Sequence, residues 1–277
     1  MTLKPNIPIK VVLGPRKCGT TTLHSLLSQV RGIAVPSPLK EAHLFDLGSV
    51  AKGELPGFCG KTWSEETRGF VDVATHYFSQ EELWSNIKDT DGVIEVGVII
   101  RDPVARAVSH CMHQMRIKNL WHLTFSDIVD LYPEVITDSS YSVVIPNLKA
   151  FFGEGSLRLI EFKRLTSDPM AVVSSLCGDF ELVESLSSIS LEKNQMNLGF
   201  RPRFPWAYSA LRGVAQTSRS VLGDTPVELI KDVLMTAWPA SGHSVTKNKI
   251  LNEMSEDSRA QALVQEREYI AQLIENG

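Results

Sequence analysis

A short segment near the start of the chain places glycines, a lysine and hydroxyl side chains in one loop. Gly14 and Gly19 bracket the segment, and Lys17 lies between them. Three hydroxyl residues follow directly, namely Thr20, Thr21 and Thr22. Glycines let successive backbone N–H groups turn toward one point, and the lysine adds positive charge there. This combination predicts an anion site, and phosphate is the first candidate.

The flanking residues predict a strand before this loop and a helix after it. Residues 9–13 are apolar apart from Lys10 and rich in β-branched side chains, whereas the apolar residues after the loop recur at helical spacing. These are Leu23, Leu26, Leu27 and Val30. A helix that begins directly after the loop directs its positive end at the same anion.

The loop differs from the nucleoside-triphosphate loop, G-x-x-x-x-G-K-[ST], at one position. That loop needs a lysine straight after its second glycine, to reach the β- and γ-phosphates. This chain has Thr20 there, and Lys17 lies two residues before Gly19, beside the terminal phosphate end of a shorter ligand. A strand-to-helix turn without a ligand is the alternative, and the basic, threonine-rich sequence makes it the weaker one.

The segment from Gly14 to Thr21 resembles the first loop of sulfotransferases that use 3′-phosphoadenosine 5′-phosphosulfate (PAPS). In that family the loop holds the 5′-phosphosulfate. The resemblance therefore implies PAPS as cofactor and an enzyme of the EC 2.8.2 type. The residues that it implies for cofactor binding here are Arg16, Lys17, Cys18, Gly19, Thr20, Thr21 and Thr22.

A second candidate phosphate-binding segment follows residues 93–100. These residues form a near-continuous apolar run, which is typical of a strand buried on both faces of a parallel sheet. The run ends at Arg101, and Asp102-Pro103 suits a helix N-cap and first turn. An arginine at the strand end and Ser109 in the helix can converge on one phosphate. The segment resembles the family's Arg-[Asp/Asn]-Pro-x-x-Arg-x-x-Ser motif, which implies that Arg101 and Ser109 bind the 3′-phosphate.

Two candidates for acid–base chemistry lie at Glu41 and His43. In an extended segment their side chains point to one face, so a carboxylate and an imidazole would project together beyond a strand end. The stretch from Lys40 to Asp46 resembles one in heparan-sulfate-type and related carbohydrate sulfotransferases, in which the glutamate is the general base. The resemblance implies Glu41 as base, with His43 orienting it or substituting for it. The alternative is that Glu41 and His43 lie on the exposed edge of a loop and have no catalytic role.

One motif of those relatives, roughly acid-x-[Ser/Thr]-Pro-x-Tyr, is only partly matched. This chain has Val73, Ala74 and Thr75 there, which puts a heparan-like acceptor in doubt. Residues 193–212 are basic and aromatic, and Arg201 is the best single candidate there for the 3′-phosphate. A solvated surface loop is an equal alternative for that segment.

No metal is expected. Among the histidines, His110, His113 and His122 have no carboxylate or cysteine at a recognisable ligand spacing. The four cysteines are far apart, which favours reduced thiols over a disulfide framework or a zinc site. A net charge of -4 gives no sign of a nucleic-acid binder or of a broad basic surface for a sulfated polymer. No apolar run suits a signal peptide or a membrane span, which predicts a cytoplasmic protein.

The remaining pattern predicts one sulfotransferase domain over residues 1–277, an α/β fold of the P-loop-like, three-layer type with a central parallel sheet flanked by helices. Further expected elements are helices at 81–88, 125–131, 141–152, 169–177, 227–238 and 255–274 and strands at 33–35, 69–73 and 157–162. Residues 51–67 show no clear period and predict a surface excursion.

The expected reaction is transfer of the sulfuryl group from PAPS to an acceptor hydroxyl, with Glu41 as base and Lys17 neutralising the leaving oxygen. The acceptor would be a glycan, a lipid-linked alcohol or a small natural product, and the sequence ranks neither these nor the oligomeric state. Two alternatives stay open: an ATP-dependent small-molecule kinase, and a non-catalytic nucleotide-binding protein on the same fold.

Overall fold

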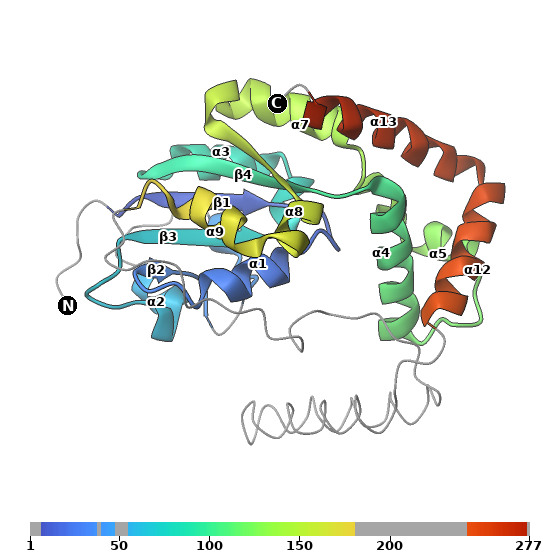
Figure 1. Cartoon of the computed structure of the whole chain (residues 1–277), viewed down its shortest axis with the longest axis horizontal. Helices are drawn as coiled ribbons and strands as arrows, with labels where there is room; N and C mark the ends of the chain where they lie inside the picture. Colours follow the sequence, from blue (N-terminus) through green and yellow to red (C-terminus); the bar gives the residue numbers. More distant parts are fainter. Residues whose placement is uncertain (1–6, 38–39, 48–54, 181–242, 276–277) are drawn as a thin grey trace, which may run out of the picture. The chain divides into compact units, whose positions relative to one another are not determined.

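A five-stranded parallel sheet is the centre of the fold, as Figure 1 shows. The computed structural model describes residues 7–37, 40–47, 55–180 and 243–275. The strand order is β2-β3-β1-β4-β5, and every neighbouring pair is parallel. The strands are β1 (Ile9–Leu13), β2 (Ile33–Ala34), β3 (Gly69–Ala74), β4 (Val93–Ile100) and β5 (Leu157–Glu161). The predicted α/β fold with a parallel sheet is confirmed.

Side chains of the central strand β1 alternate between two hydrophobic layers. Ile9, Val11 and Leu13 belong to one apolar cluster, and Val12 belongs to the other. All five residues of β1 are buried, which is what a strand covered on both faces requires. The two layers explain why the sequence of this strand is almost wholly apolar.

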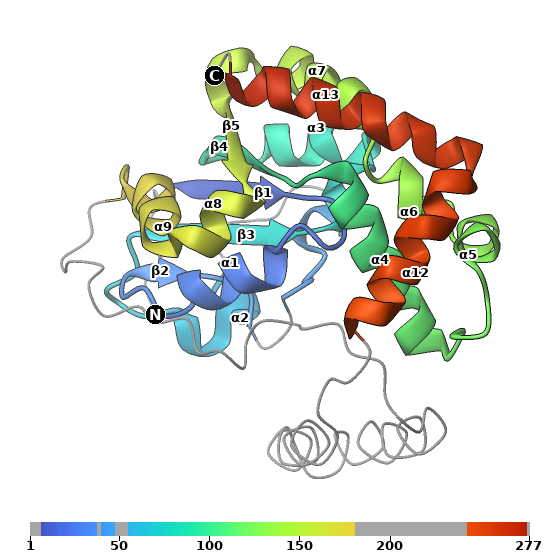
Figure 2. The same cartoon turned by 45° about the vertical axis from the view of Figure 1, so that its right-hand side comes forward.

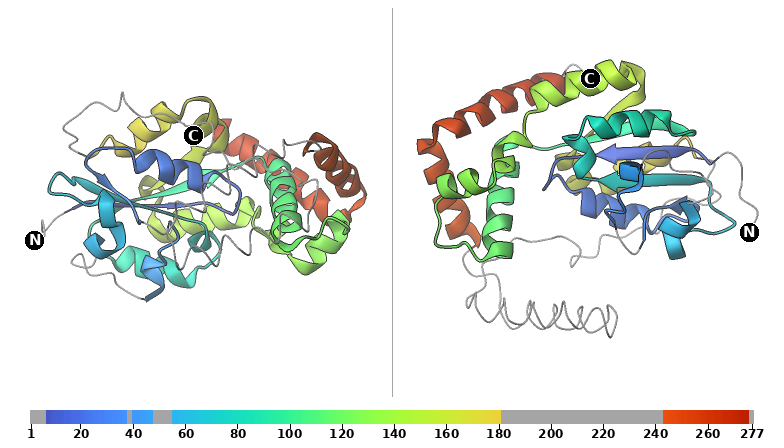
Figure 3. Two further views of the ribbon diagram at one scale, coloured as in Figure 1. Left: turned by 90° about the horizontal axis from the view of Figure 1, so that it is seen from below. Right: turned by 180° about the vertical axis from the view of Figure 1, so that it is seen from behind.

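Helices cover both faces of the sheet. Apolar side chains of α3 (Glu82–Asp89) and α7 (Tyr141–Phe152) belong to the first cluster. Those of α1 (Thr20–Leu27) and α9 (Pro169–Cys177) belong to the second, with Leu165 of α8 (Phe162–Ser167). Figures 2 and 3 show these two sets on opposite sides of the strands. The three-layer arrangement is the one that the sequence predicts.

The carboxyl ends of four neighbouring strands meet at one edge of the sheet. The segment after β1 is the glycine-bracketed loop, Thr75 follows β3, Arg101 follows β4 and Phe162 follows β5. Ligands of open α/β sheets bind outside this edge. The fold therefore brings the chemically interesting residues of four separate segments to the same end of the sheet.

The contacts divide the chain into two units, which are described separately. The first holds the sheet and comprises residues 1–106, 138–196 and 265–277. The second comprises residues 107–137 and 197–264 and includes most of α4 (Pro103–Lys118) and the helices α5 (Phe125–Leu131), α6 (Glu134–Thr137) and α12 (His243–Glu256). Within it Glu253 of α12 accepts the backbone N–H of Phe125 at 2.8 Å. The single domain over residues 1–277 stays a prediction.

Two expected elements differ from the structure. The closing helix, predicted at 255–274, is interrupted: α12 ends at Glu256, and α13 begins at Gln261 and ends at Glu275. Asp257 causes the break, since its side chain accepts the backbone N–H of Arg259 at 2.9 Å. In the predicted excursion at 51–67 the described part contains α2 (Leu55–Cys59), whose two end residues are buried because they join the first apolar cluster.

None of the helices in the described ranges combines the length and the apolar character that a membrane-spanning helix needs. The helix expected at 227–238 lies outside the described residues.

Candidate active site

The loop between β1 and α1 is held by backbone conformations that favour glycine. Gly19 precedes the first turn of α1 and has a left-handed backbone, with φ of 89°. Lys17 shares that region with φ of 76°. The backbone N–H of Cys18 donates to the carbonyl of Pro15 at 3.2 Å and closes a tight turn. The positive end of α1 and the hydroxyls of Thr20, Thr21 and Thr22 therefore lie beside the turn, as an anion site requires.

The Cys18 side chain points into the core and not toward a ligand. Its Sγ lies 3.4 Å from the hydroxyl of Tyr141 on α7. Burial raises the pKa of the thiol to about 11, so Cys18 is a neutral thiol at physiological pH. The same Tyr141 hydroxyl accepts the backbone N–H of Arg101 at 3.3 Å. Tyr141 thus joins the loop to the end of β4.

Arg101 lies directly against the loop, as the sequence predicts. Its Nη1 donates to the carbonyl of Lys17 at 2.5 Å. Its guanidinium lies 4.3 Å from the centroid of the Phe162 ring, a cation–π distance. Burial is the main cause that lowers the pKa of Arg101. Ser109, the expected partner of Arg101, is half-buried on α4 and belongs to the second unit, so its role stays a prediction.

A fully buried arginine fixes the other side of the loop. Arg106 donates from Nε to the hydroxyl of Ser139 at 2.5 Å and from Nη1 to the carbonyl of Arg16 at 3.2 Å. The side chain of Arg16 pairs with Asp138 at 3.3 Å. Arg106 therefore helps to hold the loop in place. Its side chain is fully buried, so it is not available as a ligand for a nucleotide.

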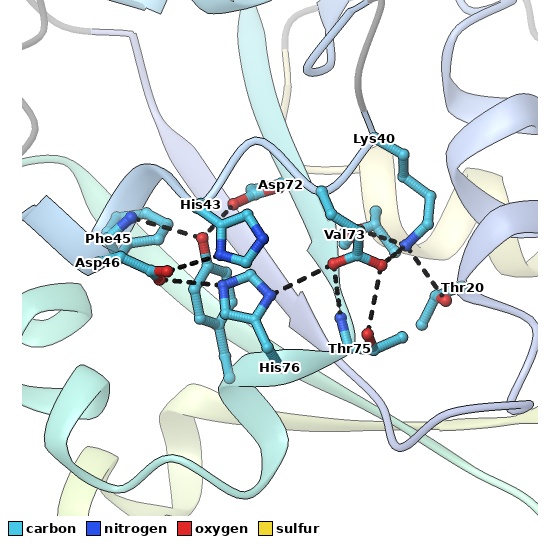
Figure 4. Close-up of polar contacts among 11 residues, drawn as sticks. Thr20, Lys40, His43, Phe45, Asp46, Asp72, Val73, Thr75 and His76 are labelled. Atoms are coloured by element: carbon cyan, nitrogen blue, oxygen red, sulfur yellow. Dashed lines mark hydrogen bonds and ion pairs between the residues drawn. The ribbon is translucent and has the colours of Figure 1, made fainter. Parts of the chain in front are cut away.

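Glu41 is the centre of a second polar group, shown in Figure 4. Its Oε2 accepts the backbone N–H of Thr75 at 3.1 Å and faces Nδ1 of His76 at 3.3 Å. Its Oε1 accepts from the hydroxyl of Thr75 at 3.3 Å and pairs with Lys40. Thr75 stands at the proline position of the partly matched motif acid-x-[Ser/Thr]-Pro-x-Tyr, and a proline there would have no N–H to donate to Glu41.

Lys40 connects this group to the loop. Its Nζ pairs with Glu41 and also donates to the hydroxyl of Thr20 at 3.3 Å and to the carbonyl of Val73 at 3.2 Å. Thr20 is the first residue of α1. The candidate base and the candidate anion site are therefore joined through one ammonium group.

The charges around Glu41 and His76 shift both pKa values. Burial alone would raise the pKa of Glu41, but the hydrogen bond from His76, the charge of Lys40 and the N–H of Thr75 outweigh it and lower the pKa to about 2. Burial would lower the pKa of His76, but Glu41 and Asp46 raise it above its usual value. These shifts stabilise the ionised form of Glu41 and the protonated form of His76.

His43 does not take the position that an extended segment would give it. Its backbone is left-handed, with φ of 52°. Its Nδ1 lies 2.6 Å from Oδ2 of Asp46, and its ring stacks on that of His76 with centroids 4.2 Å apart. The extended backbone predicted for this segment is therefore wrong at His43, although the side chains of Glu41 and His43 both contact His76. Among the described histidines, His76 is the one that bonds to Glu41.

Asp72 lies buried behind this group on β3. Its Oδ2 accepts from the hydroxyl of Tyr77 at 3.2 Å, while its Oδ1 has no hydrogen-bond partner. Burial raises the pKa of Asp72 to about 7, against the effect of the Tyr77 hydrogen bond. Asp72 and Tyr77 occupy the acid and tyrosine positions of the partly matched motif of the relatives, and here they form one buried pair.

One group in the described ranges has the composition of a metal site, namely His43, Asp46 and His76. Both oxygens of Asp46 already face an imidazole nitrogen, at 2.6 Å and 3.0 Å. The shorter separation is that of a hydrogen bond, since two ligands of a tetrahedral zinc ion with bonds of about 2 Å lie about 3.3 Å apart. We therefore assign the group to hydrogen bonding. That the chemistry needs no metal stays a prediction.

Lys40, Asp46 and His76 belong to the site although no motif in the sequence pointed to them. A signal was present for His76, which lies two residues beyond the end of β3 and hence at the edge where Glu41 was expected. No sequence signal showed that β3 lies next to β1. Arg201 lies outside the described residues, so its assignment stays a prediction.

With this geometry established, the chain can be compared with known proteins. No protein-family model matches it. The mouse (Mus musculus) protein named bifunctional heparan sulfate N-deacetylase/N-sulfotransferase 4 is 26% identical over 190 residues, which cover 62% of this chain and 22% of the mouse protein. The chain thus matches about a fifth of that relative's length.

Among solved structures, a sulfotransferase from Alicyclobacillus acidocaldarius has a TM-score of 0.50 and 22% identity, and the match covers 68% of this chain and 87% of that one. The predicted resemblance to sulfotransferases is confirmed. Mouse sulfotransferase SULT7A1, solved as a complex with PAP, is a more distant neighbour, with a TM-score of 0.34, 11% identity and coverage of 70% of this chain and 64% of that one.

Proposed function

We propose that this protein is a sulfotransferase that transfers the sulfuryl group of PAPS to an acceptor hydroxyl. Similarity to sulfotransferases supports the general activity. The observation that carries the proposal is the contact of Lys40 with both Glu41 and Thr20, because it joins a carboxylate base to the helix end where an anion would bind. An acceptor hydroxyl beside Glu41 would then face the sulfur of the cofactor.

The bond changes assign a role to each group. The acceptor oxygen bonds to sulfur while the bond from sulfur to the 5′-phosphate oxygen breaks, and the phosphate keeps that electron pair. Glu41 takes the acceptor's proton. Lys17 neutralises the charge that develops on the leaving oxygen, and Lys40, which contacts Thr20, adds positive charge at the start of α1. The product is 3′-phosphoadenosine 5′-phosphate (PAP).

The cofactor would be held at both of its ends. The hydroxyls of Thr20, Thr21 and Thr22 and the first N–H groups of α1 hold the phosphosulfate. Arg101, Ser109 and Arg201 hold the 3′-phosphate. The acceptor is a carbohydrate, a lipid-linked alcohol or a small natural product, and the partial match at Val73 and Ala74 argues against a heparan-like chain.

Calorimetric titration with PAP tests this function. We expect tight binding of PAP that is the same in magnesium and in EDTA, and weak binding of ATP. Arg101→Ala should weaken PAP binding at least about tenfold, because a charge-assisted contact to the phosphate is lost. Arg31→Ala is the matched control, since Arg31 is exposed and pairs with Glu66.

Preference for magnesium-ATP over PAP would instead support a small-molecule kinase. Binding of PAP without release of sulfate from PAPS, for any acceptor including water, would support a non-catalytic nucleotide-binding protein.

A further inference from the structure

The chain Glu41, His76, Asp46 links two carboxylates through one imidazole. Nδ1 of His76 faces Oε2 of Glu41 at 3.3 Å, and Nε2 faces Oδ1 of Asp46 at 3.0 Å. Figure 4 shows His76 beside Asp46, with a dashed line between them. Both ring nitrogens thus face carboxylates, and the protonation states of His76 differ in which of these nitrogens can donate a hydrogen bond.

We propose that His76 is a positioning residue that orients the Glu41 carboxylate and receives, through it, the proton that the acceptor hydroxyl loses. The inference rests on the proposed sulfuryl transfer and adds a residue that neither the motifs nor the comparisons assign. Arrangements of this kind, in which one carboxylate fixes the tautomer of a histidine that acts on another group, recur in enzyme active sites.

The hydrogen bonds determine which tautomer is productive. In neutral His76 the N–H on Nε2 donates to Asp46, so the lone pair on Nδ1 is directed at Glu41. In the imidazolium both nitrogens donate. Only the neutral form can take a further proton, and Asp46 then stabilises the charge that the ring acquires.

The proton balance of the step follows from these two states. Glu41 takes the proton of the acceptor hydroxyl as the new bond to sulfur forms. A proton then moves from Oε2 of Glu41 to Nδ1 of His76, so that Glu41 is again a carboxylate and His76 is an imidazolium. The imidazolium releases its proton to water before the next turnover. This route suits a carboxylate that holds a proton only weakly, because Lys40 and the backbone N–H of Thr75 lower the pKa of Glu41 whichever form His76 takes.

Several further groups act on the His76 charge. The His43 ring stacks on it at 4.2 Å, and the Tyr77 ring lies at 3.9 Å. Lys40 lies on the far side of Glu41, and the buried Asp72 interacts with His76 through its charge. Burial of His76 opposes its protonation, and the two acids favour it, with a net rise of its pKa. The rate should therefore fall on the acid side of the pH profile, and the midpoint of this fall should lie above about pH 6.5, the ordinary pKa of histidine.

The pH profile tests the proposal with PAPS as substrate and water as acceptor, by release of inorganic sulfate. We expect the rate of the natural protein to fall on the acid side of the profile. In His76→Gln this fall should be absent, and the plateau rate should be about 10²-fold lower. PAP affinity should stay within about twofold. The matched control is His122→Gln, at an exposed histidine between α4 and α5. A fall on the acid side that persists in His76→Gln would overturn the proposal, since a purely structural role changes the rate and not the profile.

A second measurement does not depend on turnover. The ring nitrogens of His76 in the ¹⁵N-labelled full chain, assigned by their loss in His76→Gln, should titrate above the usual range for histidine. Both Glu41→Gln and Asp46→Asn should lower that pKa. A normal pKa that neither variant moves would refute the proposal even in an active sulfotransferase. Failure to bind PAP would refute the proposed function instead and leave this titration interpretable.

Discussion

At the scale of single residues, Glu41 has the contacts of a base but an unusually low affinity for protons. Four groups stabilise its negative charge, which are Lys40, His76 and the hydroxyl and backbone N–H of Thr75. With a pKa of about 2, Glu41 stays ionised throughout the physiological range. The ionised carboxylate can therefore accept a hydrogen bond from the hydroxyl of the substrate. It then needs a neighbouring group to which it can transfer the proton.

Replacing this carboxylate isolates its role. We expect Glu41→Gln to reduce sulfate release from PAPS by at least about 10²-fold, because the amide fills the same space but cannot accept the proton. Binding of PAP in the calorimeter should change little. Glu154→Gln serves as the control, because Glu154 is exposed and pairs only with Lys149 among the contacts described. Near-normal turnover in Glu41→Gln with intact PAP binding would show that another group is the base.

At the scale of elements, the start of α8 supports the loop before α1. The helix α8 begins directly after β5 with the residues Phe162-Lys163-Arg164-Leu165. The Phe162 ring lies below the guanidinium of Arg101 and against the backbone of Gly19. Phe162 therefore supplies an aromatic contact to both predicted phosphate sites.

Gly19 is the position where this packing leaves no room for a side chain. A Cβ at Gly19 would lie 2.8 Å from Cδ2 of Phe162, and the residue has φ of 89°. We expect Gly19→Ala to lower the thermal midpoint by several kelvin and to weaken PAP binding at least about tenfold, since backbone strain of about 1–3 kcal/mol adds to the clash.

Gly155→Ala is the control for that substitution, because nothing lies within 4 Å of its Cβ position. Differential scanning calorimetry and PAP titration measure the two effects. Equal midpoints for the two alanine variants would show that the loop backbone is not constrained as described.

At the scale of the whole molecule, the buried Asp72 makes stability depend on pH in an unusual direction. Its pKa rises from 3.8 to about 7 on folding, with burial as the main cause. The folded state then binds a proton that the unfolded state has already lost, so stability is greatest below pH 4 as far as this group is concerned and falls as pH rises toward 7. Three pKa units correspond to about 4 kcal/mol, as an order of magnitude.

Asp72→Asn should remove this dependence. The amide mimics the neutral acid and can still accept the Tyr77 hydrogen bond, so the variant should gain about 2 kcal/mol over the natural protein between pH 5 and pH 8. Urea unfolding at the two pH values measures the gain, with Asp91→Asn as a control at an exposed aspartate. If the free energies of unfolding of Asp72→Asn and of the natural protein differed by the same amount at both pH values, Asp72 would be ionised in the folded state.

Local signals in the sequence determined much of the fold and part of the site. The strand at 9–13, the loop with Gly14 and Gly19, and the Arg101 end of β4 were all predictable, because each depends on the periodicity and turn chemistry of one continuous segment. The helices at 125–131 and 141–152 were predicted with the bounds that the structure has. The break of the closing helix at Asp257 was not predicted, because a single aspartate does not normally end a helical pattern.

Only the tertiary structure decided the surroundings of Glu41. His76 is 35 residues from Glu41 in sequence, and their contact depends on β3 lying beside β1 in the sheet. The His43 ring stacks on the ring of His76, which comes from a distant part of the sequence, after the end of β3. Phe162 reaches Gly19 only because β5 and β1 both end at the same edge. The residues that could do chemistry could thus be recognised from the sequence, whereas the order of the strands determined which of them lie next to one another.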